Sequence, residues 1–239
     1  MDKKIEASLR GVIAGIAAGK AGKLEPAVRP GPELQNFYSQ LREVFDRKAD
    51  FLTKLEAFDD LFERQSIFSH QQEILFDLLL INFFSEDAAG FGDDYLESPE
   101  WEAIEDDTVD RGTELLNIIL YLRECQENEI EPSLEDFLKE FLLVEEAEFQ
   151  DEHEVYEEVI AGQMLMEGSY EDIARAAAKI RDDAEIKDIF YPLMSFFYDP
   201  NPGHPELMEF FKHSHNKTFD CPVLFAILAY HNGLSLWKQ

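Results

Sequence analysis

The chain has 239 residues, of which 45% are hydrophobic and 20 are phenylalanine, and its formal net charge is −30. A chain of this length can bury a substantial core as one large domain or two small ones, and its apolar content argues against disorder throughout. The negative charge repels phosphate backbones and anionic lipids, so direct nucleic-acid binding and attachment to acidic membranes are disfavoured. Composition therefore predicts a folded, acidic protein.

Cysteine content and hydropathy bear on location. Cys125 and Cys221 are the two cysteines, too few for a disulfide framework and consistent with a reducing compartment. No apolar run approaches the ~20 residues that a membrane-spanning helix needs. The short apolar stretch 12–18 follows charged residues and precedes no clear cleavage site, unlike a signal peptide. We therefore expect a cytoplasmic protein with no membrane span.

The N-terminal stretch 1–30 is predicted to be an amphipathic helix followed by a linker. Its apolar side chains share one helical face: Ile5, Leu9, Val12, Ile13 and Ile16. Gly19 and Gly22 are expected to end this helix, and Pro30-Gly31-Pro32 is the clearest break in the chain. The polar face is weakly charged and aromatic residues are absent. Docking of residues 1–18 on the protein's own core is therefore favoured over binding to a membrane surface.

Residues 31–97 are predicted to form a helical cap. Apolar spacing indicates helices over 34–45, 51–62 and 74–84, and the last is apolar almost all round, which is typical of a central helix. The segment 85–97 contains two glycines and many acids and is expected to be a loop. Alternating strand patterns are nearly absent. The fold class is therefore all-α.

Residues 98–239 show a recurring helix opening. The openings begin at Ser98, Ser133, Ser169 and His204, in steps of 35, 36 and 35 residues. Serine is a good N-cap, and acids in the following turn suit the helix dipole. The period predicts helical hairpins in sequence, as an α-solenoid-like repeat, either as a separate region or within one continuous domain 31–239. The architecture of 98–232 resembles tetratricopeptide or HEAT-type arrays, although the residue patterns that identify those families are absent.

The same helical faces predict the core. Eight aliphatic side chains are expected to be almost fully buried: Leu79, Leu80, Ile118, Leu122, Ile189, Leu193, Leu224 and Leu228. Two prolines, Pro192 and Pro222, are each expected in the first turn of a helix, where the missing N–H costs little. A helix beginning as early as Ile186 would be kinked at Pro192.

Acidic residues are concentrated in the middle of the chain. Between Glu86 and Glu158 there are 27 acidic and 3 basic residues. The densest group, a candidate binding surface, comprises Glu145, Glu146, Glu148, Asp151, Glu152 and Glu154. We call these six residues the acidic cluster. Such a surface either solvates the helices that carry it or meets a basic partner, whose association it would accelerate.

Four of the six histidines lie near the C-terminus: His204, His213, His215 and His231, with Cys221 close in sequence. Zinc would need three or four of them to converge, and none of the recognised ligand spacings is present. The sequence predicts no metal, no cofactor and no catalytic residues. Whether the histidines converge is left open.

These observations favour a non-catalytic protein–protein interaction module, an adaptor or regulator whose partner is another protein, with a basic surface as one option. A first alternative is an acidic inhibitor, such as an immunity protein or DNA mimic, that neutralises a basic partner. A second alternative is a helical enzyme with a site near the C-terminal histidines.

Overall fold

The computed structural model describes residues 1–24, 30–87, 98–141 and 149–233, and every regular element in these ranges is helical. The α-helices are α1 Lys3–Ala21, α2 Pro32–Phe45, α3 Phe51–Arg64, α4 Gln72–Asn82, α5 Pro99–Thr108, α6 Leu115–Glu127, α7 Leu134–Phe141, α8 Phe149–Ala161, α9 Tyr170–Ala177, α10 Phe190–Tyr198, α11 His204–His213 and α12 Lys217–Asn232. Short 3₁₀ turns occur at η1 Ser66–Gln71, η5 Gln163–Glu167 and η6 Glu185–Lys187, and a π-helical turn at η2 Phe83–Asp87. The all-α prediction is confirmed.

Serine side chains fix the starts of three helices. The Ser98, Ser133 and Ser169 hydroxyls each accept a hydrogen bond from the backbone N–H three residues on, at 3.1, 3.2 and 3.3 Å. Each bond satisfies a donor that the first helical turn leaves unpaired. Helices α5, α7 and α9 begin at the next residue, and α11 begins at His204 itself. The four predicted helix starts are confirmed.

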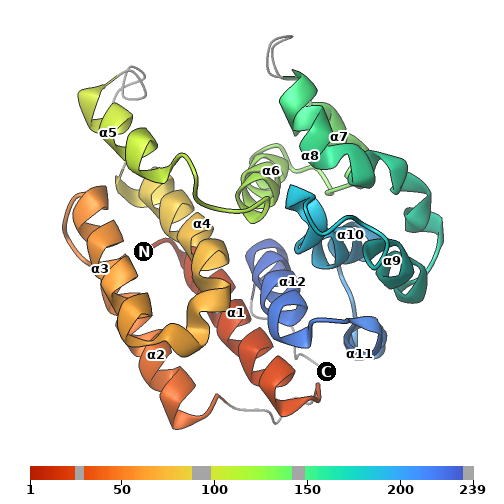
Figure 1. The fold of residues 1–239 in the computed structure, drawn as a ribbon, viewed down its shortest axis with the longest axis horizontal. Helices are drawn as coiled ribbons and strands as arrows, with labels where there is room; N and C mark the ends of the chain where they lie inside the picture. The colour runs from red at the N-terminus through yellow and green to blue at the C-terminus, as the bar shows by residue number, and fades with distance from the viewer. Residues whose placement is uncertain (25–29, 88–97, 142–148, 234–239) are drawn as a thin grey trace.

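Helix α12 lies at the centre of the molecule and packs against α1, α6 and α10. In Figure 1, α2 and α3 lie on one side of the α1–α12 pair, and α8 to α11 lie on the other. Helix α4 joins the centre by packing on α1 and α6. All eight side chains predicted to be buried are at most 8% exposed. The core prediction is confirmed.

Three glycines allow α1 and α12 to pack backbone to backbone. A Cβ added at Gly11, Gly15 or Gly19 would lie 2.3–2.5 Å from a backbone atom of α12. The helices run antiparallel, because Gly11 faces Phe225 and Gly19 faces Lys217. Ser8 Oγ adds a hydrogen bond between them by donating to the Ala226 carbonyl over 3.0 Å. Docking of the N-terminal helix on the core is thus confirmed. The prediction that Gly19 ends it is wrong, because Gly19 faces α12 and the helix continues to Ala21 before Gly22 turns left-handed at φ 64°.

Pro222 lies inside α12, five residues after its first residue, so its predicted place in a first turn is wrong. A proline has no N–H, and the Thr218 carbonyl therefore lacks its usual helical donor. The side chain of Gln71, on η1, donates to that carbonyl instead over 3.0 Å. Pro192 does fall in the first turn of α10, which begins at Phe190.

The predicted loop, the domain division and the predicted lack of a membrane span are covered by the structure only in part. Residues 85–87 belong to η2 and are helical, so the predicted loop 85–97 is wrong there, and 88–97 lie outside the described residues. The division into 1–30, 31–97 and 98–239 stays a prediction. In the described ranges, no helix combines the length and hydropathy that crossing a bilayer requires.

Candidate functional site

Half of the acidic cluster lies outside the residues that the structure describes. Glu145, Glu146 and Glu148 lie outside the described residues, while Asp151, Glu152 and Glu154 belong to α8. The side chain of Glu154 is exposed. A binding role for this cluster therefore stays a prediction.

The C-terminal histidines occupy different environments. His204 and His215 are exposed, and His213 Nε2 lies 3.4 Å from Glu209 Oε2. His231 packs edge-on against the Phe196 ring, with centroids 5.7 Å apart, and burial lowers its pKa. In the part of the chain that the structure describes, no three His, Cys, Asp or Glu side chains are placed to hold a metal.

The two cysteines are both free and both buried. Burial raises the pKa of the Cys125 thiol and, more strongly, the pKa of the Cys221 thiol. Cys221 belongs to α12 and its side chain is fully buried. The thiolate is the nucleophilic form, so each of these thiols is held in its unreactive state. We assign both a packing role.

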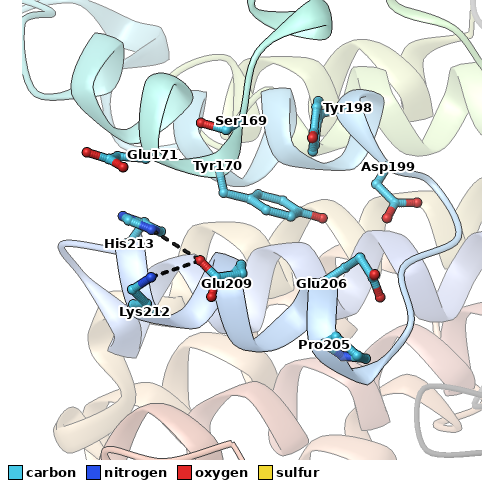
Figure 2. A pocket seen from close by; sticks show the side chains of 10 residues that line it. All are labelled: Ser169, Tyr170, Glu171, Tyr198, Asp199, Pro205, Glu206, Glu209, Lys212 and His213. Carbon is cyan, nitrogen blue, oxygen red and sulfur yellow. Dashed lines mark hydrogen bonds and ion pairs between the residues drawn. The ribbon is translucent and has the colours of Figure 1, made fainter.

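A pocket of about 520 Å³ lies between α9 and α11, closed at one end by the turn after α10. Figure 2 shows its lining, which we call the tyrosine pocket: Ser169, Tyr170, Glu171, Tyr198, Asp199, Pro205, Glu206, Glu209, Lys212 and His213. Of the histidines proposed from sequence, His213 alone is in this lining.

Charge is distributed unevenly along the tyrosine pocket. At one end Glu209 Oε2 lies 3.0 Å from Lys212 Nζ and 3.4 Å from His213 Nε2. The hydrogen bond from Lys212 is the main cause that lowers the pKa of Glu209. At the other end, Asp199 and Glu206 flank the hydroxyl of Tyr170, as Figure 2 shows. The pocket thus has one neutralised end and one anionic end.

A larger groove, of about 960 Å³, separates the start of α3 from α5. Its lining, which we call the α3–α5 groove, comprises Ala49, Asp50, Phe51, Leu52, Phe83, Glu86, Pro99, Glu100, Ala103 and Ile104. The floor is aromatic and aliphatic, because Phe51 and Phe83 pack together with centroids 5.0 Å apart. Carboxylates stand on both walls. The groove combines an apolar floor with an acidic rim.

A buried carboxylate joins α4 to the segment before α6. Asp77 is fully buried and accepts from Thr113 N at 3.1 Å and from Thr113 Oγ1 at 2.6 Å. Neighbouring Gly112, at φ 98°, donates its N–H to Glu73 over 3.0 Å, and a Cβ there would lie 2.6 Å from Asp77 Oδ1. Burial raises the pKa of Asp77 to about 8. Asp77 lines neither the pocket nor the groove, so its role is structural.

Sequence reasoning missed both cavities. Tyr170, which is almost fully buried on α9, was not singled out from the sequence, and neither was the pocket that its hydroxyl end reaches. A signal existed in Asp199-Pro200-Asn201-Pro202, a polar turn rich in proline that follows the aromatic helix α10. The α3–α5 groove joins segments about 50 residues apart, and no local pattern predicts such a pairing.

Comparisons were made with known protein families, with curated proteins and with solved structures. None of the three finds a match to this chain.

Proposed function

We propose that this protein is a non-catalytic interaction module, an adaptor or regulator, that binds a basic amphipathic helix of a partner protein. The α3–α5 groove carries the proposal, because its apolar floor and acidic rim complement the two faces of such a helix. Leucine-like side chains spaced three and four residues apart would fill the floor over Phe51 and Leu52. Lysine or arginine side chains would meet the rim.

The rim carboxylates are positioned by local structure. Asp50 caps α3 by accepting from Thr53 N over 2.9 Å, and Glu100 is exposed in the first turn of α5. Glu86 extends from η2 on the same side. Rim charges of this kind govern the association rate and the choice of partner more than the final affinity. The apolar floor would supply the affinity.

A groove test uses an 18-residue peptide with leucines on one helical face and lysines on the other, and a scrambled peptide of equal composition. In a Trp237→Phe background, Trp101 on α5 is the remaining tryptophan; it is next in sequence to the lining residue Glu100, and the change in its fluorescence is used to follow binding. Ala103→Phe should weaken peptide binding by about tenfold or more, because Ala103 is exposed on the wall and a phenylalanine there fills the groove.

Two neighbouring glutamates provide a matched charge control. Glu100 and Glu102 are both exposed in the first turn of α5, but only Glu100 lines the groove. Glu100→Lys should weaken binding of the peptide about three- to tenfold at low salt, and Glu102→Lys should have a much smaller effect on binding. Binding that is equally tight for the scrambled peptide, or in Ala103→Phe, would contradict the proposal.

The acidic cluster is proposed to accelerate the same encounter. Changing Glu145, Glu146, Glu148 and Glu152 together to Gln should slow association of the basic peptide about three- to tenfold at low salt, with little effect at 0.5 M salt. Stopped-flow fluorescence measures the rate. The control removes the same charge from exposed positions on α2 and α3, through Glu33, Glu43, Glu56 and Glu63. An equal loss in the control would mean that net charge alone acts, and that the cluster has no special role.

The net charge of −30 favours a second candidate, an acidic inhibitor that covers the nucleic-acid-binding face of a basic protein, as an immunity protein or DNA mimic does. The two candidate functions differ in which ligand should displace the partner protein. Duplex DNA would displace a partner held through its nucleic-acid face, because both ligands need that face. A partner held by a helix in the α3–α5 groove would instead be displaced by the leucine–lysine peptide.

We also propose that α5 to α12 derive from a unit of about 35 residues and that the protein acts in the cytoplasm. The even spacing of the four helix starts, three with the same serine cap, supports the repeat. The two buried free thiols support the location.

A further inference from the structure

The hydroxyl of Tyr170 has a position that packing alone does not explain. The side chain is only 6% exposed, and its ring packs at steep angles against Tyr198 and Phe210, with centroids 5.0 and 6.1 Å away. No group in the described part of the chain hydrogen-bonds the hydroxyl. Figure 2 shows it pointing into the tyrosine pocket, toward Asp199 and Glu206. The ring is buried, whereas the hydroxyl oxygen opens onto the pocket, where a ligand can form a hydrogen bond with it.

The two carboxylates beside this hydroxyl are held in place by the turn between α10 and α11. Asn201 N donates to Asp199 Oδ1 over 3.1 Å. Glu206 bends back over Gly203, where a Cβ would lie 2.8 Å from its Oε2. Lys212 and His213 instead contact Glu209 at the far end. The Tyr170 end therefore carries negative charge that neither of these two side chains contacts.

Tyr170 itself adds no charge to this end. Burial, followed by the nearby Asp199 carboxylate, raises its pKa, so the phenol stays protonated at neutral pH. Its oxygen can then accept one hydrogen bond, while each carboxylate can accept several. The site offers acceptors on one side and aromatic ring surface on the other.

We propose that the Tyr170 end of the tyrosine pocket binds an organic cation, the guanidinium or ammonium group of a basic side chain. A guanidinium is planar and carries five N–H donors, which suits two carboxylates and a phenol oxygen around one point. The crossed rings of Tyr170 and Tyr198 add the aromatic contact that such cations favour. A divalent metal fits less well, because the described residues place no three ligating side chains together.

This site lies on α9, α10 and α11, whereas the α3–α5 groove is built by α3, η2 and α5. The inference therefore does not depend on the groove having an occupant. Either site can fail its test while the other stands.

The test titrates the isolated protein with acetyl-Gly-Arg-Gly-amide and follows backbone amide signals by NMR. The uncharged isostere, with citrulline in place of arginine, is the matched ligand control. We expect a Kd of about 1–10 mM for the arginine peptide, with saturable shifts at residues 170, 199 and 206, and no saturation with citrulline. n-Butylguanidine, a monocation like the peptide's side chain, distinguishes the two sources of the cation in a parallel titration. Tighter binding by n-butylguanidine indicates a small free guanidine, and equal or weaker binding indicates a protein side chain.

Three variants locate the site. Glu206→Gln and Asp199→Asn should each raise the Kd for the arginine peptide by about tenfold. Tyr170→Phe should weaken it about threefold and leave the melting temperature unchanged or raised, because only an unpaired hydroxyl is removed. Glu63→Gln, an equal loss of charge at an exposed position of α3, should have no effect.

Several results would overturn the inference. These are equal binding of the citrulline peptide, an equal effect of Glu63→Gln, or saturation of the same signals by CaCl₂ with exclusion of the arginine peptide. A fall in melting temperature for Tyr170→Phe without a change in Kd would show that the hydroxyl has a structural role only.

Discussion

Gly15→Ala should destabilise the protein by about 2–4 kcal/mol, although the same change within a helix usually stabilises it by up to about 1 kcal/mol. The added Cβ would lie 2.4 Å from the backbone nitrogen of Pro222 and 2.5 Å from Cys221 C. Backbone atoms inside a helix cannot move aside as a flexible side chain can, so α1 and α12 must separate and lose contact along their length. Gly15→Leu should prevent stable folding, because the total free energy of unfolding of a domain is only about 5–15 kcal/mol.

Urea unfolding followed by far-ultraviolet circular dichroism measures both changes. Gly31→Ala is the matched control, since an added Cβ there meets nothing within 4 Å at an ordinary φ of −65°. Its effect should stay within about 1 kcal/mol. If Gly15→Ala proved as stable as the wild type, α1 and α12 would have to lie farther apart than described.

The unfolding free energy should fall between pH 5 and pH 8 in the wild type by up to about 4 kcal/mol more than in Asp77→Asn. Burial raises the pKa of Asp77 to about 8 in the folded state, against the ordinary value of 3.8. Between these values the folded protein holds a proton that the unfolded chain releases, so each pH unit removes up to about 1.4 kcal/mol of stability. The stabilisation is complete below pH ~4 and is lost as the pH rises through 8.

Asparagine serves as the comparison because it has the shape of aspartic acid and does not titrate. Its side-chain oxygen can still accept from Thr113 N, which lies 3.1 Å from Asp77 Oδ1. Repulsion among the many surface carboxylates also changes with pH, but it is common to both proteins and cancels in the difference. Parallel pH profiles for the two proteins would show that Asp77 keeps its charge when buried.

Much of the fold follows from short-range patterns in the sequence. Helix starts were predictable because the caps at Ser98, Ser133 and Ser169 act within three residues. The core was predictable because helical periodicity shows which side chains share a face. Leu79 and Leu193, for example, are both fully buried.

The unpredicted features depend on contacts between distant segments. Gly11, Gly15 and Gly19 are spaced four apart, a pattern that predicts close helix packing, but it does not identify α12 as the partner. Pro222 is tolerated inside a helix because Gln71, about 150 residues earlier, supplies the missing donor. The candidate sites have the same origin, since the Tyr170 hydroxyl meets Asp199 and Glu206 only after α9 packs beside α11.

The pairing of α1 with α12 also constrains how the chain folds as it is made. Ala21 leaves the ribosome 196 residues before Lys217, a delay of roughly 10–40 s at ordinary synthesis rates. During that interval the glycine face of α1 has no partner, and the apolar side chains beside it are open to chaperones and to other nascent chains. The α1 face can therefore be covered only after α12 has been made, and truncation before Lys217 should yield a chain that remains bound to chaperones.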